Sequence, residues 1–281
     1  MSRRFRQVDV FGTSALGGNP VAVVLDGEGL TTEEMVRFTA WTNLSECTFV
    51  LPPTTDEADY RVRIFAPGSE CPFAGHPTLG TARAWLDAGG VPKTPGVIVQ
   101  ECGAGLIQVR EEDGLLSFAA PGLIRGGEVE ESYLQDVVEI LGIEREDVVE
   151  ARWIDNGPGW VGVLLADDRA VVNLQPNASR HPGRWDIGVL GPCADGDQDA
   201  FEVRGFFSDG LGGPLMEDPV TGSLNASASQ WMIETGRAIA PFSNRQGGCM
   251  DRDGRVHIKD IDGALWVGGT AEVVFSGEYR G

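Results

Sequence analysis

The sequence predicts an α+β fold made of two halves of like structure. Across its 281 residues, 39 glycines and 16 prolines are spread throughout, which indicates many short strands joined by turns. A strand, loop and helix pattern at Arg61–Trp85 also returns at Glu202–Ser227. We therefore expect mainly antiparallel strands, few helices and two pseudo-symmetric domains. Their expected bounds are 1–120 and 121–281, and the final strand could pack back on the first domain.

Short apolar or alternating runs bounded by turn residues mark the expected strands. They are Gln7–Phe11, Val21–Leu25, Cys47–Leu51, Tyr60–Phe65, Val97–Glu101, Leu106–Arg110, Leu116–Ala119, Val161–Leu165, Ala200–Phe207, Arg255–Lys259, Ala264–Gly268 and Ala271–Phe275. The expected helices are Thr31–Thr42, Pro77–Asp87, Ser132–Leu141 and Pro219–Thr235. The first opens with a capping-box pattern, and each of the others ends at or near a glycine.

The repeat places similar residues at the start of two helices. Each copy has a polar residue, His76 or Asp218, followed by a proline and, three residues later, a glycine. Because proline is favoured at the first helical position, we expect His76 and Asp218 at or near helix N-caps. Small residues nearby, Gly75 in one copy and Gly222 with Ser223 in the other, would let a ligand approach the backbone N–H groups. Each helix start is therefore a candidate carboxylate or phosphate site.

Glu46 is a candidate proton-transfer residue. On a strand it would share a face with Thr48 and Val50, among largely apolar neighbours. A carboxyl group held there would have a raised pKa and could shuttle a proton. The alternative is an exposed glutamate at a strand start, and spacing alone favours that alternative.

Histidine positions are informative because the chain has only three. His76, before a proline at a helix start, could donate to a substrate or polarise a carbonyl, or it could be a structural turn residue; spacing does not decide. For His181 and His257 we favour a structural role. Asp218 is explained by N-capping alone, and its place opposite His76 in the repeat is what suggests a function.

Charge excludes several functional classes. Lys and Arg number 22 against 42 Asp and Glu, which gives a net charge of −20. Nucleic-acid binding needs clustered cations, and so does a polybasic membrane anchor, so neither partner is expected. No apolar run has the ~18 residues of a membrane-spanning helix.

Metal and cofactor sites are not predicted either. The five cysteines lie far apart without C-x-x-C spacing, as expected of reduced thiols in a cytoplasmic protein. No group of His, Cys and carboxylate residues has metal-ligand spacing. No dinucleotide fingerprint or nucleophile elbow occurs, so we expect neither a cofactor nor a hydrolase triad.

Several motifs in order along the chain resemble the phenazine-biosynthesis PhzF-like family. They are Asp9–Phe11, Gly17–Val23, Asn43–Glu46, Pro72–Gly80, Glu217–Ser223, Arg245–Gly247 and Trp266–Gly269. Singly these motifs are weak, but together they are specific and cover nearly the whole chain.

The resemblance implies the diaminopimelate epimerase fold, in which each domain wraps an antiparallel sheet around a central helix and the active site lies between the domains. It also implies a cofactor-free isomerase acting on a small carboxylate, usually as a homodimer. Glu46 matches the family's proton-shuttling glutamate. His76, Asp218 and Ser223 match its other site residues, beside Gly75 and Gly222 at the helix starts.

The resemblance also separates subclasses. Thiol-dependent relatives place one cysteine in each helix-start loop, where this chain has Ala74 and a second loop, Asp218–Ser223, without cysteine. A carboxylate shuttle is therefore favoured over two-thiol racemisation. Two alternatives remain open: an amino-acid epimerase or racemase on the same scaffold, with Asp218 or His76 as second base, and a non-catalytic small-molecule-binding protein.

Overall fold

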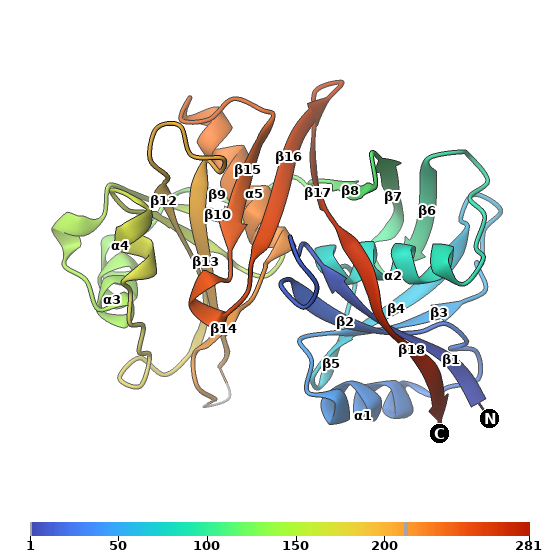
Figure 1. Cartoon of the computed structure of the whole chain (residues 1–281). Helices are drawn as coiled ribbons and strands as arrows, with labels where there is room; N and C mark the ends of the chain where they lie inside the picture. The colour runs from blue at the N-terminus through green and yellow to red at the C-terminus, as the bar shows by residue number, and fades with distance from the viewer. Residues whose placement is uncertain (1, 211–212) are drawn as a thin grey trace. The chain divides into compact units, whose positions relative to one another are not determined.

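The computed structural model describes residues 2–210 and 213–281 and divides into two compact units (Figure 1). Unit 1 comprises Met1–Ala119 and Gly268–Gly281, and unit 2 comprises Ala120–Val267. The final strand of the chain thus belongs to the same unit as the first.

Unit 1 is a mixed sheet with two helices. Its elements are β1 (Ser2–Val10), β2 (Asn19–Val24), α1 (Thr32–Thr42), β3 (Cys47–Leu51), β4 (Tyr60–Ala66), β5 (Ser69–Cys71), α2 (Gly75–Asp87), β6 (Val97–Cys102), β7 (Gly105–Glu112), β8 (Leu115–Ala119) and β18 (Ala271–Arg280). The strands pair in the order β18-β1-β2-β3-β4-β6-β7-β8, with β5 forming a hairpin with β4. The β2–β3 and β4–β6 pairs are parallel and the others are antiparallel.

Unit 2 has three helices and a comparable sheet. Its elements are β9 (Arg125–Glu128), α3 (Glu131–Leu141), β10 (Glu150–Asp155), β11 (Val161–Leu164), α4 (Asp168–Val172), β12 (Arg184–Pro192), β13 (Phe201–Asp209), β14 (Met216–Asp218), α5 (Gly222–Glu234), β15 (Phe242–Gln246) and β16 (Gly254–Ile261). Short 3₁₀ turns occur at Arg145–Asp147 and Gly248–Met250, and β17 (Ala264–Gly269) crosses the division between the units.

The sheet of unit 2 follows the same strand order as the first seven strands of the unit 1 sheet, from β18 to β7. In unit 2 the order is β9-β10-β11-β12-β13-β15-β16, with β14 forming a hairpin with β13. The parallel pairs, β11–β12 and β13–β15, occupy the same places as β2–β3 and β4–β6 in unit 1. The repeat seen in the sequence is therefore a repeat of topology, and the predicted α+β class is confirmed.

Each sheet carries helices on both faces. Helix α2 contacts strands of unit 1 from β1 to β8, and the Cβ of an alanine at Gly80 would lie 2.2 Å from Val21 Cγ1. In unit 2, an alanine Cβ at Gly188 would lie 2.1 Å from Leu224 Cδ1 of α5. Glycine therefore permits close approach of helix and sheet in both units. Helix α1 covers the other side of unit 1, where Met35 is buried with Phe49.

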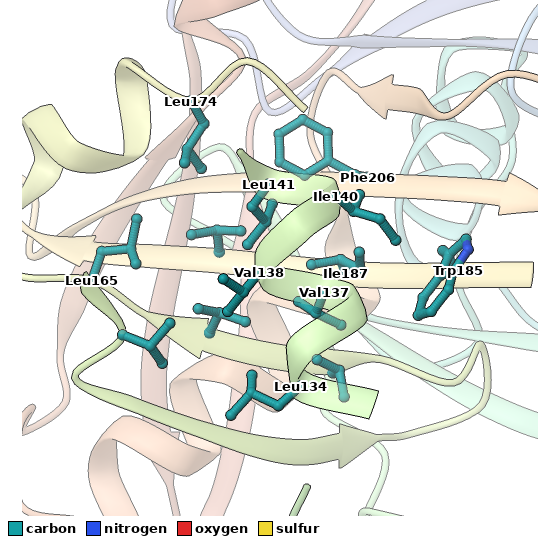
Figure 2. Close-up of a cluster of buried hydrophobic side chains, with 14 of the residues drawn as sticks. Leu134, Val137, Val138, Ile140, Leu141, Leu165, Leu174, Trp185, Ile187 and Phe206 are labelled. Atoms are coloured by element: carbon teal, nitrogen blue, oxygen red, sulfur yellow. The ribbon is translucent and has the colours of Figure 1, made fainter. Parts of the chain in front are cut away.

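Helix α3 covers the other face of the unit 2 sheet (Figure 2). Its apolar stripe, which includes Leu134, Val137 and Leu141, packs with Ile187 and Trp185 of β12. Side chains of a strand alternate between faces, so Leu190 of the same strand joins the α5 cluster instead. The predicted amphipathic helix and its end at Gly142 (φ 70°) are confirmed.

The helix ends follow their sequence signals, but two helix starts do not. In α1 the Glu34 N–H donates to Thr31 Oγ1 (3.2 Å) and the Thr31 N–H donates to Glu34 Oε2 (2.8 Å), so the capping box is confirmed. Helix α2, however, begins two residues before Pro77, and α5 begins three residues after Pro219. The prediction that these prolines open the helices was wrong.

The strand prediction also missed elements of unit 2. Strands β10 and β12 and the short helix α4 were not expected, nor were the short strands β9, β14 and β15; the short strand β5 of unit 1 was not expected either. Strand β12 is buried on both faces, so its sequence is nearly continuously apolar and lacks the alternation of a half-buried strand. Within the described residues, no helix is long and apolar enough to span a membrane.

Candidate active site

Glu46 and His76 lie together in unit 1. Glu46 directly precedes β3, and His76 is the second residue of α2. His76 Nε2 lies 3.5 Å from Glu46 Oε2. The histidine side chain is only 6% exposed, whereas that of the glutamate is 21% exposed. Glu46 can therefore reach solvent or a ligand while the ring behind it remains buried.

His76 is a neutral imidazole near pH 7. Burial lowers its pKa to about 3, because the charged ring would lose its hydration. The contact with Glu46 is consequently not an ion pair, and 3.5 Å exceeds an ordinary N–H···O distance. Asn19 Nδ2 lies 3.4 Å from Nδ1, and an amide NH₂ can only donate. This arrangement favours the tautomer whose Nε2–H points toward Glu46.

A glycine-rich loop places Asn19. Asp9, near the end of β1, accepts the Gly18 N–H at 2.9 and 3.2 Å. A Cβ at Gly18 would lie 2.1 Å from the Val10 carbonyl oxygen, so only glycine fits there. The loop delivers Asn19 as the first residue of β2, fully buried beside His76.

Asp218 lies at the end of β14 in unit 2. Its carboxylate accepts the Thr221 hydroxyl at 2.7 Å, and the residue is 9% exposed. Thr221 is the N-cap of α5, so Asp218 precedes the cap by three residues and is not itself the cap. Neither predicted residue is the N-cap itself, but both lie near one: Asp218 precedes Thr221 by three residues, and His76 follows the α2 cap, Ala74, by two.

Ser223 occupies the same place in α5 as His76 does in α2. Its hydroxyl accepts the indole N–H of Trp160 at 3.0 Å, and its carbonyl accepts from Asn156 Nδ2 at 2.9 Å. Gly222 is the first residue of this helix, as Gly75 is of α2.

The loop before Trp160 repeats the design of the loop before Asn19. Asp155, the last residue of β10, accepts the N–H groups of Gly157 (2.7 Å) and Gly159 (2.8 Å). In both units an aspartate at the end of a strand holds a glycine loop, and the loop delivers a donor to the second residue of the central helix. We did not predict Asn19 or Trp160 as site residues from the sequence. The pattern of an aspartate followed by glycines, which occurs before both residues, could have indicated them.

The two central helices, α2 and α5, both begin without a capping hydrogen bond from the N-cap side chain. Neither Ala74 nor Thr221 makes a side-chain capping hydrogen bond to its helix. The N-cap side chains therefore do not satisfy the first-turn amides of either helix, and the helix dipole favours negative charge at both places. The predicted residues form two sets: Glu46, Gly75 and His76 in unit 1, and Asp218, Gly222 and Ser223 in unit 2.

One group of three described side chains has ligand atoms close enough for a metal ion. Asp168, Cys193 and Asp197 place these atoms within 4.8 Å of one another. Arg245, however, pairs with Asp168 at 2.6 Å and Asp197 at 3.1 Å, so a cation already occupies this place. Burial raises the pKa of Cys193 to about 11, which keeps the thiol protonated. The group is better suited to holding Arg245 than a metal.

Comparison with known proteins decides the family. Residues 8–277 match the family described as phenazine biosynthesis-like protein. The chain belongs to this family. Antisense-enhancing sequence 1 of Schizosaccharomyces pombe is 33% identical over 98% of this chain and 97% of its own length. A protein of Pasteurella multocida named as an uncharacterized isomerase is 30% identical over 98% of this chain and 93% of its own length.

A shorter match concerns a relative with a named reaction. The trans-2,3-dihydro-3-hydroxyanthranilate isomerase of Pseudomonas aeruginosa is 53% identical over 81 residues, which is 29% of each chain. Membership of the phenazine biosynthesis-like family, together with these relatives, identifies the chain as an isomerase.

Solved structures confirm the fold. A PhzF-family protein of Bacillus anthracis superposes with a TM-score of 0.83 over 100% of this chain and 99% of its own, at 23% identity. A hydroxyproline epimerase from Agrobacterium vitis superposes with a TM-score of 0.60 over 99% of this chain and 92% of its own, at 12% identity. The expected epimerase-like fold is therefore confirmed.

Proposed function

We propose that this isomerase moves a proton on a small carboxylate-bearing metabolite, without a cofactor and with Glu46 as the proton shuttle. The observation that carries the proposal is the placement of Glu46. Its carboxyl group is partly exposed and backed by a buried, neutral His76 at 3.5 Å. A carboxylate in such a setting is a suitable general base, and after accepting a proton it is a suitable general acid.

The proposed reaction has two proton transfers. Glu46 removes a proton from a substrate carbon, so a C–H bond breaks and a carboxylic O–H bond forms. The electron pair stays on the substrate as enolate-like charge spread toward its carboxylate. Glu46 then returns the proton to a different carbon, which restores the carboxylate and completes the isomerisation. No redox partner is required.

The remaining candidate residues bind and orient. The uncapped amides at Gly75 and His76 suit a carboxylate or developing negative charge, as do those at Gly222 and Ser223. His76, as a neutral Nε2–H donor, orients the Glu46 carboxyl group. Asp218, held by the Thr221 hydroxyl, orients polar groups of the substrate.

The substrate class follows from the named relative and the helix starts. Trans-2,3-dihydro-3-hydroxyanthranilate carries a carboxylate and is the compound in the name of the Pseudomonas aeruginosa relative. We therefore propose it as the first compound to assay. We further expect a cytoplasmic homodimer.

An epimerase working through two thiols is disfavoured by the cysteines themselves. Cys71 is the cysteine closest in sequence to α2, and burial raises its pKa, so a reactive thiolate is not favoured there. An epimerase would invert one stereocentre, whereas the proposed isomerase moves a proton between two carbons.

Deuterium labelling distinguishes these possibilities. The protein is incubated with trans-2,3-dihydro-3-hydroxyanthranilate in D₂O, and the position of each incorporated deuterium is read by NMR. Migration between carbons supports the isomerase. Exchange with inversion at a single carbon would select the epimerase, and absence of any exchange would contradict the proposal for this compound.

A further inference from the structure

Gln246, the last residue of β15, makes hydrogen bonds through every donor and acceptor of its side-chain amide at the start of α5. The residue is 1% exposed. Its Oε1 accepts the Thr221 N–H at 2.9 Å and Asn225 Nδ2 at 2.8 Å. Its Nε2 donates to the Asp218 carbonyl at 3.1 Å and to Thr221 Oγ1 at 3.0 Å. A glutamine amide has two acceptor sites and two donor protons, and here all four are used.

These bonds connect three consecutive parts of the chain. Asp218 ends β14, Thr221 caps α5, and Asn225 is the fourth residue of that helix. A single buried side chain therefore fixes the angle at which the strand enters the helix. Asn225 is held in turn, because its Oδ1 accepts from Asn244 Nδ2 at 3.0 Å.

The direction of the hydrogen bonds matters for Asp218. A threonine hydroxyl has one proton and two acceptor lone pairs. Because Gln246 Nε2 donates to this oxygen, the hydroxyl's own proton remains available for Asp218 Oδ2, which it reaches at 2.7 Å. The relay runs in one direction, from Gln246 through Thr221 to the Asp218 carboxylate.

Unit 1 lacks this relay at the equivalent place. There Gln100 Nε2 donates to Thr78, the fourth residue of α2, at 2.9 Å, much as Asn244 donates to Asn225. Two residues further along the strand, Cys102 stands where unit 2 has Gln246. A thiol offers one weak donor and cannot make four such bonds. The glutamine is thus particular to the unit that carries Asp218.

We propose that Gln246 is a positioning residue of the isomerase, which acts through Thr221 to orient the Asp218 carboxylate and the first amides of α5. This inference rests on the proposed role of Asp218 in substrate orientation. Gln246 does not itself need to touch the substrate, because its amide is fully engaged within unit 2.

The first test needs no substrate. Amide exchange of Gln246→Met is followed by NMR at Thr221, with Ala228 in the middle of α5 as the internal reference. We expect exchange at Thr221 to accelerate at least tenfold while Ala228 changes less than twofold. Equal protection of Thr221 in both proteins would overturn the proposal.

The second test asks whether the effect reaches catalysis. With trans-2,3-dihydro-3-hydroxyanthranilate as the probe, Gln246→Met and Thr221→Val should each lower kcat about 10- to 100-fold, and Thr221→Ser should restore most of it. The double variant should be no slower than the slower single variant, because both changes break one relay. Multiplying effects, or wild-type kcat in Gln246→Met, would contradict the relay.

Two controls separate the possible failures. Gln230→Met removes a glutamine within α5, whose Nε2 donates to the Pro121 carbonyl at 3.1 Å, and the kcat of this variant should stay within about twofold of wild type. An equal loss in this control would mean that the helix is merely disturbed, and would overturn the positioning role. If Glu46→Gln is inactive while Gln246→Met is normal, this inference fails and the proposed function stands. If Glu46→Gln keeps full turnover, the proposed function fails first.

Discussion

His76 Nε2 and Glu46 Oε2 lie 3.5 Å apart, yet the histidine is neutral because burial lowers its pKa to about 3. The pair is therefore a buried donor behind a partly exposed carboxylate and not a salt bridge. In the proposed function, this arrangement would leave the Glu46 carboxylate available for proton abstraction. It also makes the folded state sensitive to acid.

Replacement of His76 should flatten the acid sensitivity of folding. The unfolded histidine titrates near pH 6.5 and the folded one near pH 3, so between these values the unfolded state binds more protons. The native state is therefore favoured above pH 6.5 and loses stability as the pH falls, by at most ~1.4 kcal/mol per pH unit.

Urea unfolding at several pH values between 6.5 and 5.0 measures this effect. We expect the stability of wild type relative to His76→Gln to fall across this interval. Carboxyl groups that titrate in both proteins largely cancel in the difference. A difference that does not change with pH would show that His76 titrates normally in the folded protein.

Asn19→Asp should reverse the tautomer of His76. An aspartate beside Nδ1 accepts a proton there, where the asparagine amide donates at 3.4 Å. The new negative charge also favours the imidazolium, so the pKa of His76 should rise above its value of about 3. Titration of the His76 ring protons by NMR measures the shift, and kcat should fall about tenfold or more. An unchanged ring titration would mean that Asn19 does not control this histidine.

Gly80→Ala should destabilise unit 1 through the packing of its central helix. The added Cβ would lie 2.2 Å from Val21 Cγ1, which forces the helix and β2 apart. Overpacking of this kind costs about 1–3 kcal/mol, and combining it with Val21→Ala should recover part of that loss. Gly122→Ala is the matched control, because nothing lies within 4 Å of the added atom. Denaturant unfolding of the variants measures the change; equal stability of Gly80→Ala and Gly122→Ala would refute the close approach.

The sequence shows that the two halves repeat. It does not show which residue of one copy corresponds to which residue of the other. Matching the prolines pairs His76 with Asp218, whereas the helix starts pair His76 with Ser223. By the same alignment Asp218 corresponds to Cys71, since each ends the short strand four residues before its helix. Pro77 fits inside the first turn of α2 because the N–H groups of that turn have no partner within the helix.

The buried polar contacts could not be predicted from the sequence, because they join residues that lie far apart along the chain. Gln246 reaches Thr221 across 25 positions because β15 pairs in parallel with β13, so no local pattern could reveal the contact. Glu46 and His76 are likewise joined only through the packing of α2 against β3. Helix ends were predictable because capping boxes and C-terminal glycines act within a few residues.

The most direct test of Glu46 as the proton shuttle compares two variants, Glu46→Gln and Glu57→Gln. Glu57 is an exposed glutamate of the same unit. The measurement is deuterium incorporation from D₂O into trans-2,3-dihydro-3-hydroxyanthranilate. Removal of the proposed general base should slow incorporation by about 10²- to 10⁴-fold in Glu46→Gln, with the fold intact by circular dichroism, while Glu57→Gln behaves as wild type. Wild-type incorporation in a folded Glu46→Gln protein would contradict the assignment of Glu46 as the proton shuttle.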